Sequence, residues 1–516
     1  MSEIVPENNM SRSKKAFKNL FFSMFTQIIT LILTFVNRSV FVKILGIEYL
    51  GISGLFTNIL NVLSFMELGI GNAIIFSMYA PMAKNDTKKL SALINFYKKS
   101  YSIIGILICV LGLMLIPFLK FIVKDVPNVN ENIIVIYIFY LFNIVISYFY
   151  IYKSAIINAD QKNYIISIQN QIFKIVQCVC QIVFLVITHK FLIYLSIQVI
   201  CTFLTNYTIS KKADKMYPYL AENKNEAIDQ EEKKSIFENV KSLFVYKIGD
   251  AILNSTDNIL ISALINITSV GLVSNYLMII NNVRYIICQG LSAITSTVGN
   301  LNSTDDIDRQ ESVFNQLLLI VIWIFGFLSV GYMLCINELI VLWIGEGYTV
   351  NNFVTLAIII QFYLMALEFT PYTYRITMGL FVQGKYASLV GAVLNIVLSI
   401  VFSKIWGLAG IFFATSVARL MTLGWVDPYL IYKKRFNKSV LVYFKKWTLY
   451  NILVFINYFI VKYILSFINL SGISGFCIKI IVITIVFNLV QLLFLFKTRD
   501  FRDLMVRLKN IFRKNA

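Results

Sequence analysis

The sequence is poor in the residues that most enzymes use for metal binding and for acid–base chemistry near neutral pH. Its 516 residues include a single histidine, His189, and one imidazole makes neither a metal cluster nor a histidine-based catalytic centre. No GxxxxGK[ST] segment occurs, which excludes a P-loop ATPase. The seven cysteines include no CxxC pair and indicate no disulfide framework. We therefore expect no cofactor, no metal site and no enzymatic activity.

Charged residues are also scarce. They make up 14% of the chain, whereas 58% of the residues are hydrophobic, and the mean hydropathy is +0.74. Soluble domains average roughly 45–50% apolar residues, so the excess predicts membrane spans of about 20 residues each. The sequence thus predicts an all-α polytopic membrane protein with about fourteen spans, near residues 17–42, 50–78, 101–123, 132–156, 163–187, 190–210, 240–264, 270–298, 313–337, 352–378, 386–404, 407–431, 447–468 and 474–496.

Positive charge is concentrated in alternate loops. The chain has 46 Lys and Arg against 27 Asp and Glu, a net charge of +19. Because Lys and Arg collect in short cytoplasmic loops, this bias places both termini in the cytoplasm and does not imply a nucleic-acid partner. The last segment, residues 497–516, is basic and amphipathic. Its pattern predicts a helix that lies on the inner leaflet and contacts membrane lipids.

One long polar interruption, residues 211–239, divides the predicted spans into six before and eight after. Residues 40–51 (VFVKILGIEYLG) align with residues 260–271 (LISALINITSVG) at an offset of 220 positions. This faint repeat predicts two six-helix lobes of the same topology. The expected organisation is a cytoplasmic N-terminus at 1–16, an N-lobe at 17–210, a cytoplasmic inter-lobe loop at 211–239, a C-lobe at 240–431, two further spans within 447–496 and the basic tail at 497–516.

Several predicted spans carry polar side chains at helical spacing. In the seventh span, Lys247, Asp250, Asn254 and Asp257 follow one another at steps of three and four residues, which places them on one helix face. Ionisable groups at membrane depth are costly, and they are normally kept where they face a bundle interior or a water-filled path. The stripes together therefore predict a central polar cavity. Pro371 in the tenth span removes a backbone hydrogen bond and predicts a kink there.

The charges of these stripes suggest an anionic cargo. Arginine presents a planar, permanently charged fork that suits phosphate oxygens, and amides can hydrogen-bond sugar hydroxyls. The acids either pair with the cations or bind a coupling proton or Na⁺. Lys174 fits snorkelling from a span end as well as a cavity. The predicted substrate-binding residues are Arg38, Lys247, Arg284, Arg375, Arg419, Asn254 and Gln361, and the predicted coupling or charge-partner residues are Glu67, Asp250, Asp257 and Glu368.

Two stretches carry a family resemblance. They are NRSVFVKILGIEYLGISGLFTNILNVLSFMELGIGNAIIFSMYAPMAKND (residues 37–86) and STDNILISALINITSVGLVSNYLMIINNV (residues 255–283). Both resemble the Wzx-type polysaccharide flippases of the multidrug/oligosaccharidyl-lipid/polysaccharide exporter superfamily. The matching polar positions are Arg38, Glu67 and Asp257.

The resemblance implies both an architecture and a function. The architecture would be two six-helix lobes around a central cavity, two extra C-terminal helices and alternating access. The protein would lie in the bacterial cytoplasmic (inner) membrane and move an undecaprenyl-diphosphate-linked oligosaccharide repeat unit to the outer leaflet. Such a flippase serves cell-surface polysaccharide biosynthesis and has other polysaccharide assembly proteins as partners.

Two other functions remain open from the residues alone. A MATE-like, cation-coupled exporter of small cationic molecules would favour an acidic cavity, whereas cations are here at least as many as acids. A membrane polysaccharide polymerase or glycosyltransferase would need a catalytic loop. Asp305, Asp306 and Asp308 could bind a metal ion in such an enzyme, but a solvated acidic loop is the more frequent explanation of such a cluster.

Overall fold

The structure, a computed structural model, is helical throughout the part of the chain that it describes. It contains no β-strand within those residues, so the all-α prediction is confirmed. The described residues are 12–64, 67, 70–123, 129–160, 162–223, 226–231, 233–234, 249, 252–253, 255–302, 306–378, 380, 384, 386–468 and 470–515.

The helices group into two compact units, and each is described by itself. Unit 1 comprises Met1–Gly46, Met66–Pro117 and Val129–Lys241, and unit 2 comprises Ile47–Phe65, Phe118–Asn128 and Ser242–Ala516. Unit 2 thus includes one long helix, α2, from the first half of the sequence.

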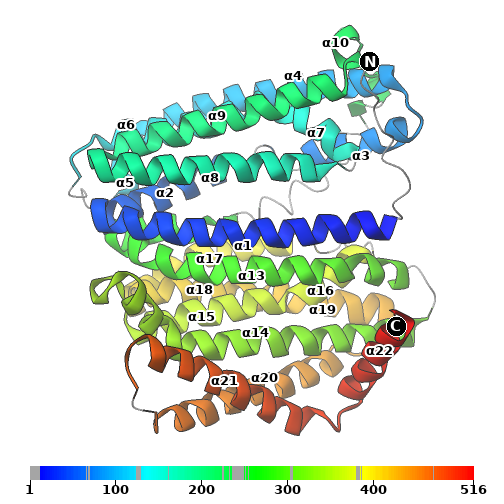
Figure 1. Cartoon of the computed structure of the whole chain (residues 1–516). Coiled ribbons are helices and arrows are strands. Elements are labelled where there is room, and N and C mark those ends of the chain that lie inside the picture. The colour runs from blue at the N-terminus through cyan, green and yellow to red at the C-terminus, as the bar shows by residue number, and fades with distance from the viewer. Residues whose placement is uncertain are drawn as a thin grey trace. The chain divides into compact units, whose positions relative to one another are not determined.

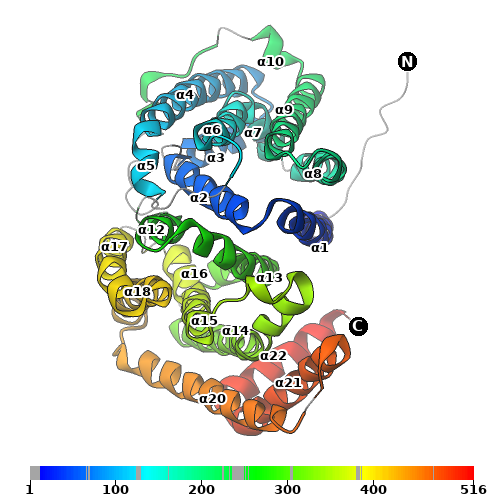
Figure 2. The same ribbon diagram turned by 90° about the vertical axis from the view of Figure 1, so that its left-hand side faces the viewer.

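Unit 1 consists of long helices that pack lengthwise (Figure 1). Figure 2 views them nearly end-on, with α8 beside α9 and α4 beside α6. Its helices are α1 (Arg12–Leu45), α3 (Ile70–Ala83), α4 (Thr87–Met114), α6 (Ile133–Tyr148), α7 (Ile151–Ala159), α8 (Asn163–Thr188), α9 (Phe191–Met216) and the short α10 (Tyr219–Glu222).

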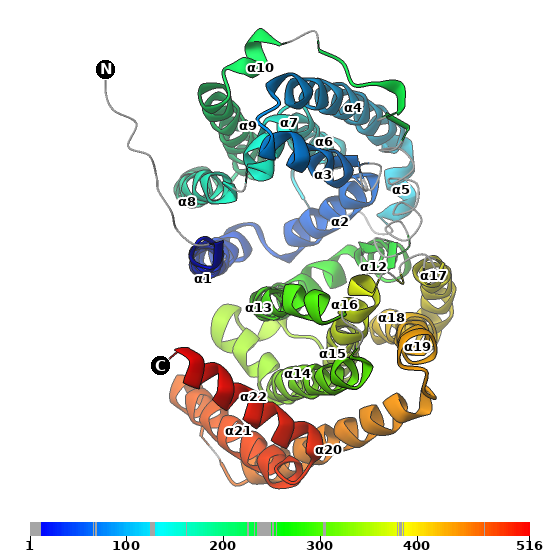
Figure 3. The same ribbon diagram turned by 90° about the vertical axis from the view of Figure 1, so that its right-hand side faces the viewer.

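Unit 2 is built around its longest helix, α14, against which α15, α20, α21 and α22 pack. Figure 3 shows α20, α21 and α22 along one side of α14. The helices of unit 2 are α2 (Ile47–Ser64), α5 (Leu119–Ile122), α12 (Asp257–Leu264), α13 (Ile267–Asn302), α14 (Ile307–Ile344), α15 (Asn352–Leu367), α16 (Phe369–Thr377), α17 (Ala387–Trp406), α18 (Leu408–Met421), α19 (Leu423–Ile431), α20 (Leu441–Leu465), α21 (Gly472–Leu495) and α22 (Arg499–Asn515).

The lengths and composition of these helices fit a membrane. Nine helices among the described residues are long and apolar enough to span one, or up to ten if the bent pair of α6 and α7 counts as one span. The span predicted at 50–78 falls on two helices, α2 and α3. The span predicted at 240–264 lies largely outside the described residues, which resume continuously at Ser255.

The helix is interrupted just before Pro371, although α15 and α16 together form one span and are not among the helix pairs bent by more than 40°. Helix α15 ends at Leu367 and α16 begins at Phe369, within one apolar segment. Pro371 has no N–H to donate to the carbonyl of Leu367, four residues earlier, and its ring crowds that carbonyl. The next amide, that of Tyr372, donates to Glu368 O at 2.9 Å. The break therefore leaves Glu368 at the junction of two helix segments.

The repeat in the sequence has a counterpart in a helix crossing within unit 2. A Cβ placed on Gly51 of α2 would lie 2.2 Å from the carbonyl oxygen of Ile267, and one placed on Gly271 of α13 would lie 2.4 Å from that of Ile47. Gly51 and Gly271 are 220 positions apart, and so are Ile47 and Ile267. Corresponding segments thus pack on each other reciprocally, which only glycine permits at this distance. This crossing favours the repeat as an organising feature of the chain.

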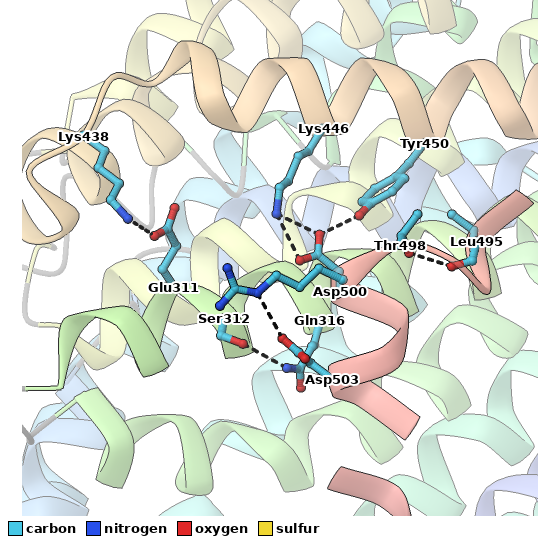
Figure 4. Close-up of polar contacts among 11 residues, drawn as sticks. Glu311, Ser312, Gln316, Lys438, Lys446, Tyr450, Leu495, Thr498, Asp500 and Asp503 are labelled. Atoms are coloured by element: carbon cyan, nitrogen blue, oxygen red, sulfur yellow. Dashed lines mark hydrogen bonds and ion pairs between the residues drawn. The ribbon is translucent and has the colours of Figure 1, made fainter. Parts of the chain in front are cut away.

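The start of the C-terminal helix α22 packs on α14 and α20 (Figure 4). Asp500 accepts hydrogen bonds from Lys446 Nζ at 2.8 and 3.0 Å and from the Tyr450 hydroxyl at 2.6 Å. Phe501 stacks on Trp323, with ring centroids 5.9 Å apart. At Phe501 the apolar face of the tail therefore packs on the helix bundle instead of facing the inner leaflet, because the Asp500 contacts hold the start of α22 against α20.

Candidate functional site

The structure places most of the predicted site residues on facing helices within one unit or the other. Arg38 and Glu67 belong to unit 1, and Lys247, Asp250 and Asn254 lie outside the described residues. The remaining predicted residues all belong to unit 2: Asp257, Arg284, Gln361, Glu368, Arg375 and Arg419.

In unit 2, Asp257 is the centre of a buried polar network. It opens α12, and only 8% of the residue is exposed. Gln361 Nε2 of α15 donates to its Oδ2 at 2.7 Å, and the Thr415 hydroxyl of α18 donates to its Oδ1 at 2.9 Å. Asn395 Nδ2 of α17 donates to Thr415 Oγ1 at 2.5 Å, and the Thr256 hydroxyl donates to Asn395 Oδ1 at 3.2 Å. Helices α15, α17 and α18 and the N-cap residue of α12 thus supply neutral polar groups to this network, and Arg419 is its charged neighbour.

The side-chain amide oxygen of Gln361 is the one acceptor of this network that we consider as a further ligand atom. This atom, Oε1, is buried and has no hydrogen-bond partner among the described residues. A buried acceptor without a donor is costly, and carboxylate, amide and hydroxyl oxygens are the ligands that hard cations prefer. The Asp257 network can therefore take up either a proton or a small hard cation.

Arg375 forms a fully buried ion pair. Its Nε lies 3.1 Å from Oδ1 of Asp427 on α19, and the two side chains are 1% and 3% exposed. Gly384 packs against the guanidinium so closely that a Cβ there would lie 2.5 Å from Arg375 Nη1. Removing one partner of such a pair leaves a buried charge uncompensated. In this conformation Arg375 could bind an external anion only by exchanging Asp427 for it.

Arg419 is paired in the same way but less deeply. Its Nη1 lies 2.6 Å from Glu368 Oε2, at the break beside Pro371, and the side chains are 3% and 17% exposed. Arg284 lies on α13, partly buried, with Cys288 one turn further along the helix. Two of the predicted phosphate-binding arginines, Arg375 and Arg419, are therefore neutralised by carboxylates of the same unit.

In unit 1, Glu67 is held by tyrosines. The Tyr101 hydroxyl donates to Glu67 Oε1 at 2.6 Å, and Tyr97 stacks on Tyr101 with ring centroids 4.4 Å apart. A Cβ on Gly71 would lie 2.4 Å from the Tyr101 hydroxyl oxygen and 2.7 Å from that of Tyr97. Gly71 thus gives both hydroxyls room beside the carboxylate.

A second polar feature of unit 1 runs between α1 and α8, and we call it the α1–α8 seam. The Thr30 hydroxyl donates to Gln171 Oε1 at 2.9 Å. Further along both helices, Asn37 Nδ2 contacts Gln181 Oε1 at 3.0 Å and the Tyr194 hydroxyl at 3.1 Å. All these groups are neutral, so the seam contributes hydrogen bonds but no negative charge.

Arg38 lies at one end of this seam, directly after Asn37. It is partly buried, and it interacts electrostatically with Tyr140 and Tyr194. Its Nη1 is buried without a hydrogen-bond partner among the described residues. No ion pair to a carboxylate joins Arg38 to any part of the chain that the structure describes. Its charge is therefore available to an external anion.

Asp306 and Asp308 have structural roles, and Asp305 lies outside the described residues. Asp306 is the N-cap of α14 and accepts from the Arg309 amide at 3.0 Å. Lys438 pairs with Glu311 (Figure 4). Lys438 Nζ also lies 3.7 Å from Asp308 Oδ1. The hydrogen bond to Glu311 raises the pKa of Lys438 above its ordinary value. Among the described residues, no three His, Cys, Asp or Glu side chains lie together so that they could hold a metal ion.

Several site residues were missed from the sequence. Asn395 lies between Ser388 and Ser399 at steps of seven and four residues. Thr415 precedes Arg419 by four residues, so helical spacing offered a signal for both. Tyr101 follows a basic loop and has the pattern of an ordinary interfacial aromatic. Asp427 offered a usable signal, because it lies eight residues after Arg419, about two helical turns, in a predicted span. A carboxylate at that depth requires a partner.

Comparison with known proteins identifies relatives by structure. No protein-family model matches the chain, and no curated protein sequence matches it. Among solved structures, the lipid II flippase MurJ in an inward-closed conformation has a TM-score of 0.66 at 16% identity, over 94% of this chain and 99% of that chain. An inward-facing multidrug resistance MATE family transporter of the MOP superfamily has a TM-score of 0.59 at 13% identity, over 78% and 97%. A mutant of the Vibrio cholerae MATE transporter VcmN has a TM-score of 0.56 at 12% identity, over 83% and 98%.

These matches cover nearly the full length of each neighbour, at sequence identities low enough that they establish the fold alone. The chain therefore has the polytopic, all-helical fold of the MurJ and MATE transporters.

Proposed function

We propose that this protein is a flippase for an undecaprenyl-diphosphate-linked oligosaccharide repeat unit in cell-surface polysaccharide biosynthesis. It moves the lipid-linked sugar from the cytoplasmic to the outer leaflet of the bacterial cytoplasmic membrane by alternating access. Its fold neighbour MurJ is, by its name, a flippase of lipid II, so the fold is compatible with a lipid cargo.

The observation that carries this proposal is the state of Arg38. Its guanidinium is partly buried, lies beside neutral hydrogen-bonding groups and is joined to no carboxylate among the described residues. An unneutralised guanidinium at membrane depth is expensive and is characteristically functional. Its fork geometry suits phosphate oxygens, and the amides of Asn37 and Gln181 can exchange their mutual hydrogen bond for sugar hydroxyls. This charge would repel a cationic drug.

The Asp257 network is suited to the coupling step. We assign it the coupling ion, a proton or Na⁺, because it offers a buried carboxylate together with the acceptor oxygen of Gln361. Binding of a cation there would neutralise Asp257 and change the hydrogen bonds among α12, α15, α17 and α18. Such a change in contacts between helices is the differential interaction that a conformational shift requires.

A complementation experiment in cells tests the proposal. Arg38→Ala and Arg284→Ala should be made in the chain expressed in its own host and compared at matched protein level. We expect lipid-linked oligosaccharide to accumulate in the inner leaflet and surface polysaccharide to fall, because the rate of flipping should drop by about tenfold or more, the equivalent of about 1.4 kcal/mol in the barrier. Arg38→Lys should restore only part of the activity, because lysine keeps the charge and loses the fork.

Two outcomes would contradict the proposal. Normal surface polysaccharide in the double alanine variant would exclude a role for these arginines in moving the cargo. Resistance to cationic dyes that depends on the wild-type chain, without any change in surface polysaccharide, would instead favour a MATE-like exporter.

A further inference from the structure

Lys174 lies well inside its helix. Helix α8 runs from Asn163 to Thr188, so Lys174 is about 16 Å along the axis from one end and about 21 Å from the other, at about 1.5 Å per residue. A lysine that snorkels lies near a span end and on a face that meets lipid. The face on which Lys174 lies therefore decides whether snorkelling explains it.

Lys174 also faces away from the apolar surface of α8. Ile172, Val176, Val179 and Val183 are 44–53% exposed and recur at helical spacing, so they form the lipid-facing stripe. Lys174 follows Ile172 by two positions, which is about 200° around the helix at 3.6 residues per turn. Its side chain therefore leaves the helix on the opposite face.

That opposite face is the side of α8 that forms the α1–α8 seam. Gln171 and Gln181 bond to α1 on it, and Cys178 Sγ donates to the Leu33 carbonyl at 3.5 Å. Along α8, Lys174 lies between Gln171 and Cys178, which both contact α1. Lys174 itself is exposed, and so is Asn170 one turn before it.

Lys174 has no negative neighbour to neutralise it. The titratable groups close enough to interact with its ammonium group are the thiols of Cys178 and Cys201. Within the described ranges of the chain, no carboxylate lies within ion-pair distance of its ammonium group. A lone ammonium in mid-span costs at least about 2.5 kcal/mol in lipid. The exposed polar face of α8 must therefore meet water or an anion.

We propose that Lys174 binds an oxyanion of the cargo, on the same seam as Arg38. This inference rests on the proposed function and names a further contact of the same site. The paired contacts of Leu33 with Cys178 and of Asn37 with Gln181 place Arg38 about eight residues of α8 beyond Lys174, or about 12 Å along the axis. A diphosphate that accepts a hydrogen bond at each end covers a similar length.

The two cations would act differently on the diphosphate. Arg38 offers a rigid, bidentate fork, which fixes the orientation of one phosphate. Lys174 offers a compact point charge on a flexible stem, which can follow the second phosphate as the cargo moves. Together they neutralise charge that would otherwise enter a low dielectric uncompensated.

Binding to the purified, full-length protein in nanodiscs tests this inference. The probe is geranylgeranyl diphosphate, and the reference probe is the uncharged alcohol geranylgeraniol. We expect wild type to prefer the diphosphate, and Lys174→Met to raise the Kd for the diphosphate by about tenfold, the equivalent of about 1.4 kcal/mol, with little change for the alcohol. Lys174→Arg should bind the diphosphate within about threefold of wild type. Lys190→Met is the matched control, because Lys190 is an exposed lysine just before α9, and it should change neither Kd.

The outcomes separate the inference from the proposed function. If wild type prefers the diphosphate and Lys174→Met binds it equally well, the Lys174 inference is wrong and the proposed function stands. If wild type shows no preference for the diphosphate, the proposed function itself fails. Thermal unfolding supplies the folding control: loss of an unpaired charge should leave the melting temperature equal or higher. A melting temperature several degrees lower in Lys174→Met would reveal a structural partner and overturn the inference.

Discussion

Three arginines of the two units differ in what they contact. In unit 2, Arg375 and Arg419 each meet a carboxylate, Asp427 at 3.1 Å and Glu368 at 2.6 Å. In unit 1, Arg38 lies among neutral amides and tyrosines and pairs with no carboxylate that the structure describes. Arginines that look equivalent in the sequence therefore differ in what they can do. Arg375 and Arg419 join helices of unit 2, whereas we propose that Arg38 receives a ligand.

The difference follows from the free energy of a buried charge. A charge at membrane depth persists either because a partner of opposite sign compensates it or because function requires it. A compensated charge contributes to stability and is not available to a ligand without an exchange of partners. An uncompensated charge lowers stability, and removing it should cost function and not folding.

The largest expected effect is on the stability of unit 2. Arg375→Ala leaves Asp427 buried without a counter-charge, and we expect a loss of about 3–5 kcal/mol, seen as a large fall in detergent-solubilised, folded protein and in melting temperature. The double variant Arg375→Leu with Asp427→Leu should recover most of that loss, because it removes both charges. Arg38→Ala is the control from unit 1 and should keep the wild-type melting temperature. Equal losses in Arg375→Ala and Arg38→Ala would erase the distinction between the units.

A second expected effect concerns coupling. Asp257→Asn keeps the size and planar shape of the side chain and removes its charge. Its amide nitrogen can donate to Oε1 of a rotated Gln361 amide, so we expect diphosphate binding to persist while transport loses its dependence on an ion gradient. Transport in vesicles with and without an imposed proton or Na⁺ gradient measures this. Glu67→Gln is the parallel variant in unit 1. If gradient dependence survives both changes, these carboxylates serve only as structural partners.

An intermediate effect on stability is expected at the helix break beside Pro371. Arg419→Ala removes the partner of Glu368, which is 17% exposed and can therefore be solvated in part. We expect a loss of about 1–3 kcal/mol, smaller than that of Arg375→Ala. Glu368→Gln should cost less still, because it keeps a hydrogen-bond acceptor for Arg419. Melting temperatures measured side by side would contradict the argument from burial if Arg419→Ala were the more damaging of the two arginine variants.

The smallest expected effect is at the start of α22. Lys446 is 31% exposed and Asp500 is 11% exposed, and such partly solvated pairs contribute about 1 kcal/mol or less. Asp500→Asn should leave the global melting temperature nearly unchanged and should increase proteolytic cleavage near residue 499. Unchanged proteolysis would show that the packing of Phe501 on Trp323 alone holds this helix.

The sequence predicted the helices well, because hydrophobic runs and helical periodicity are local properties. Helix α8 spans 163–188 where 163–187 was predicted, and the helix break before Pro371 follows from a missing amide. Which charge meets which partner was not predictable. Asp427 pairs with Arg375 across more than fifty residues, and helix orientation decides such contacts. The membership of α2 in unit 2 likewise depends on a glycine crossing that no local pattern reveals.

Flipping in proteoliposomes tests the central claim most directly. Purified protein would be reconstituted with a fluorescent prenyl-diphosphate-linked oligosaccharide, and the fraction of label that an impermeant quencher reaches would be followed over time. Wild type and the Arg375→Leu, Asp427→Leu double variant should move the cargo across the bilayer at similar rates, whereas Arg38→Ala and Lys174→Met should be slower by about tenfold or more, the equivalent of about 1.4 kcal/mol in the barrier. Wild-type flipping rates in Arg38→Ala and Lys174→Met together would contradict the account.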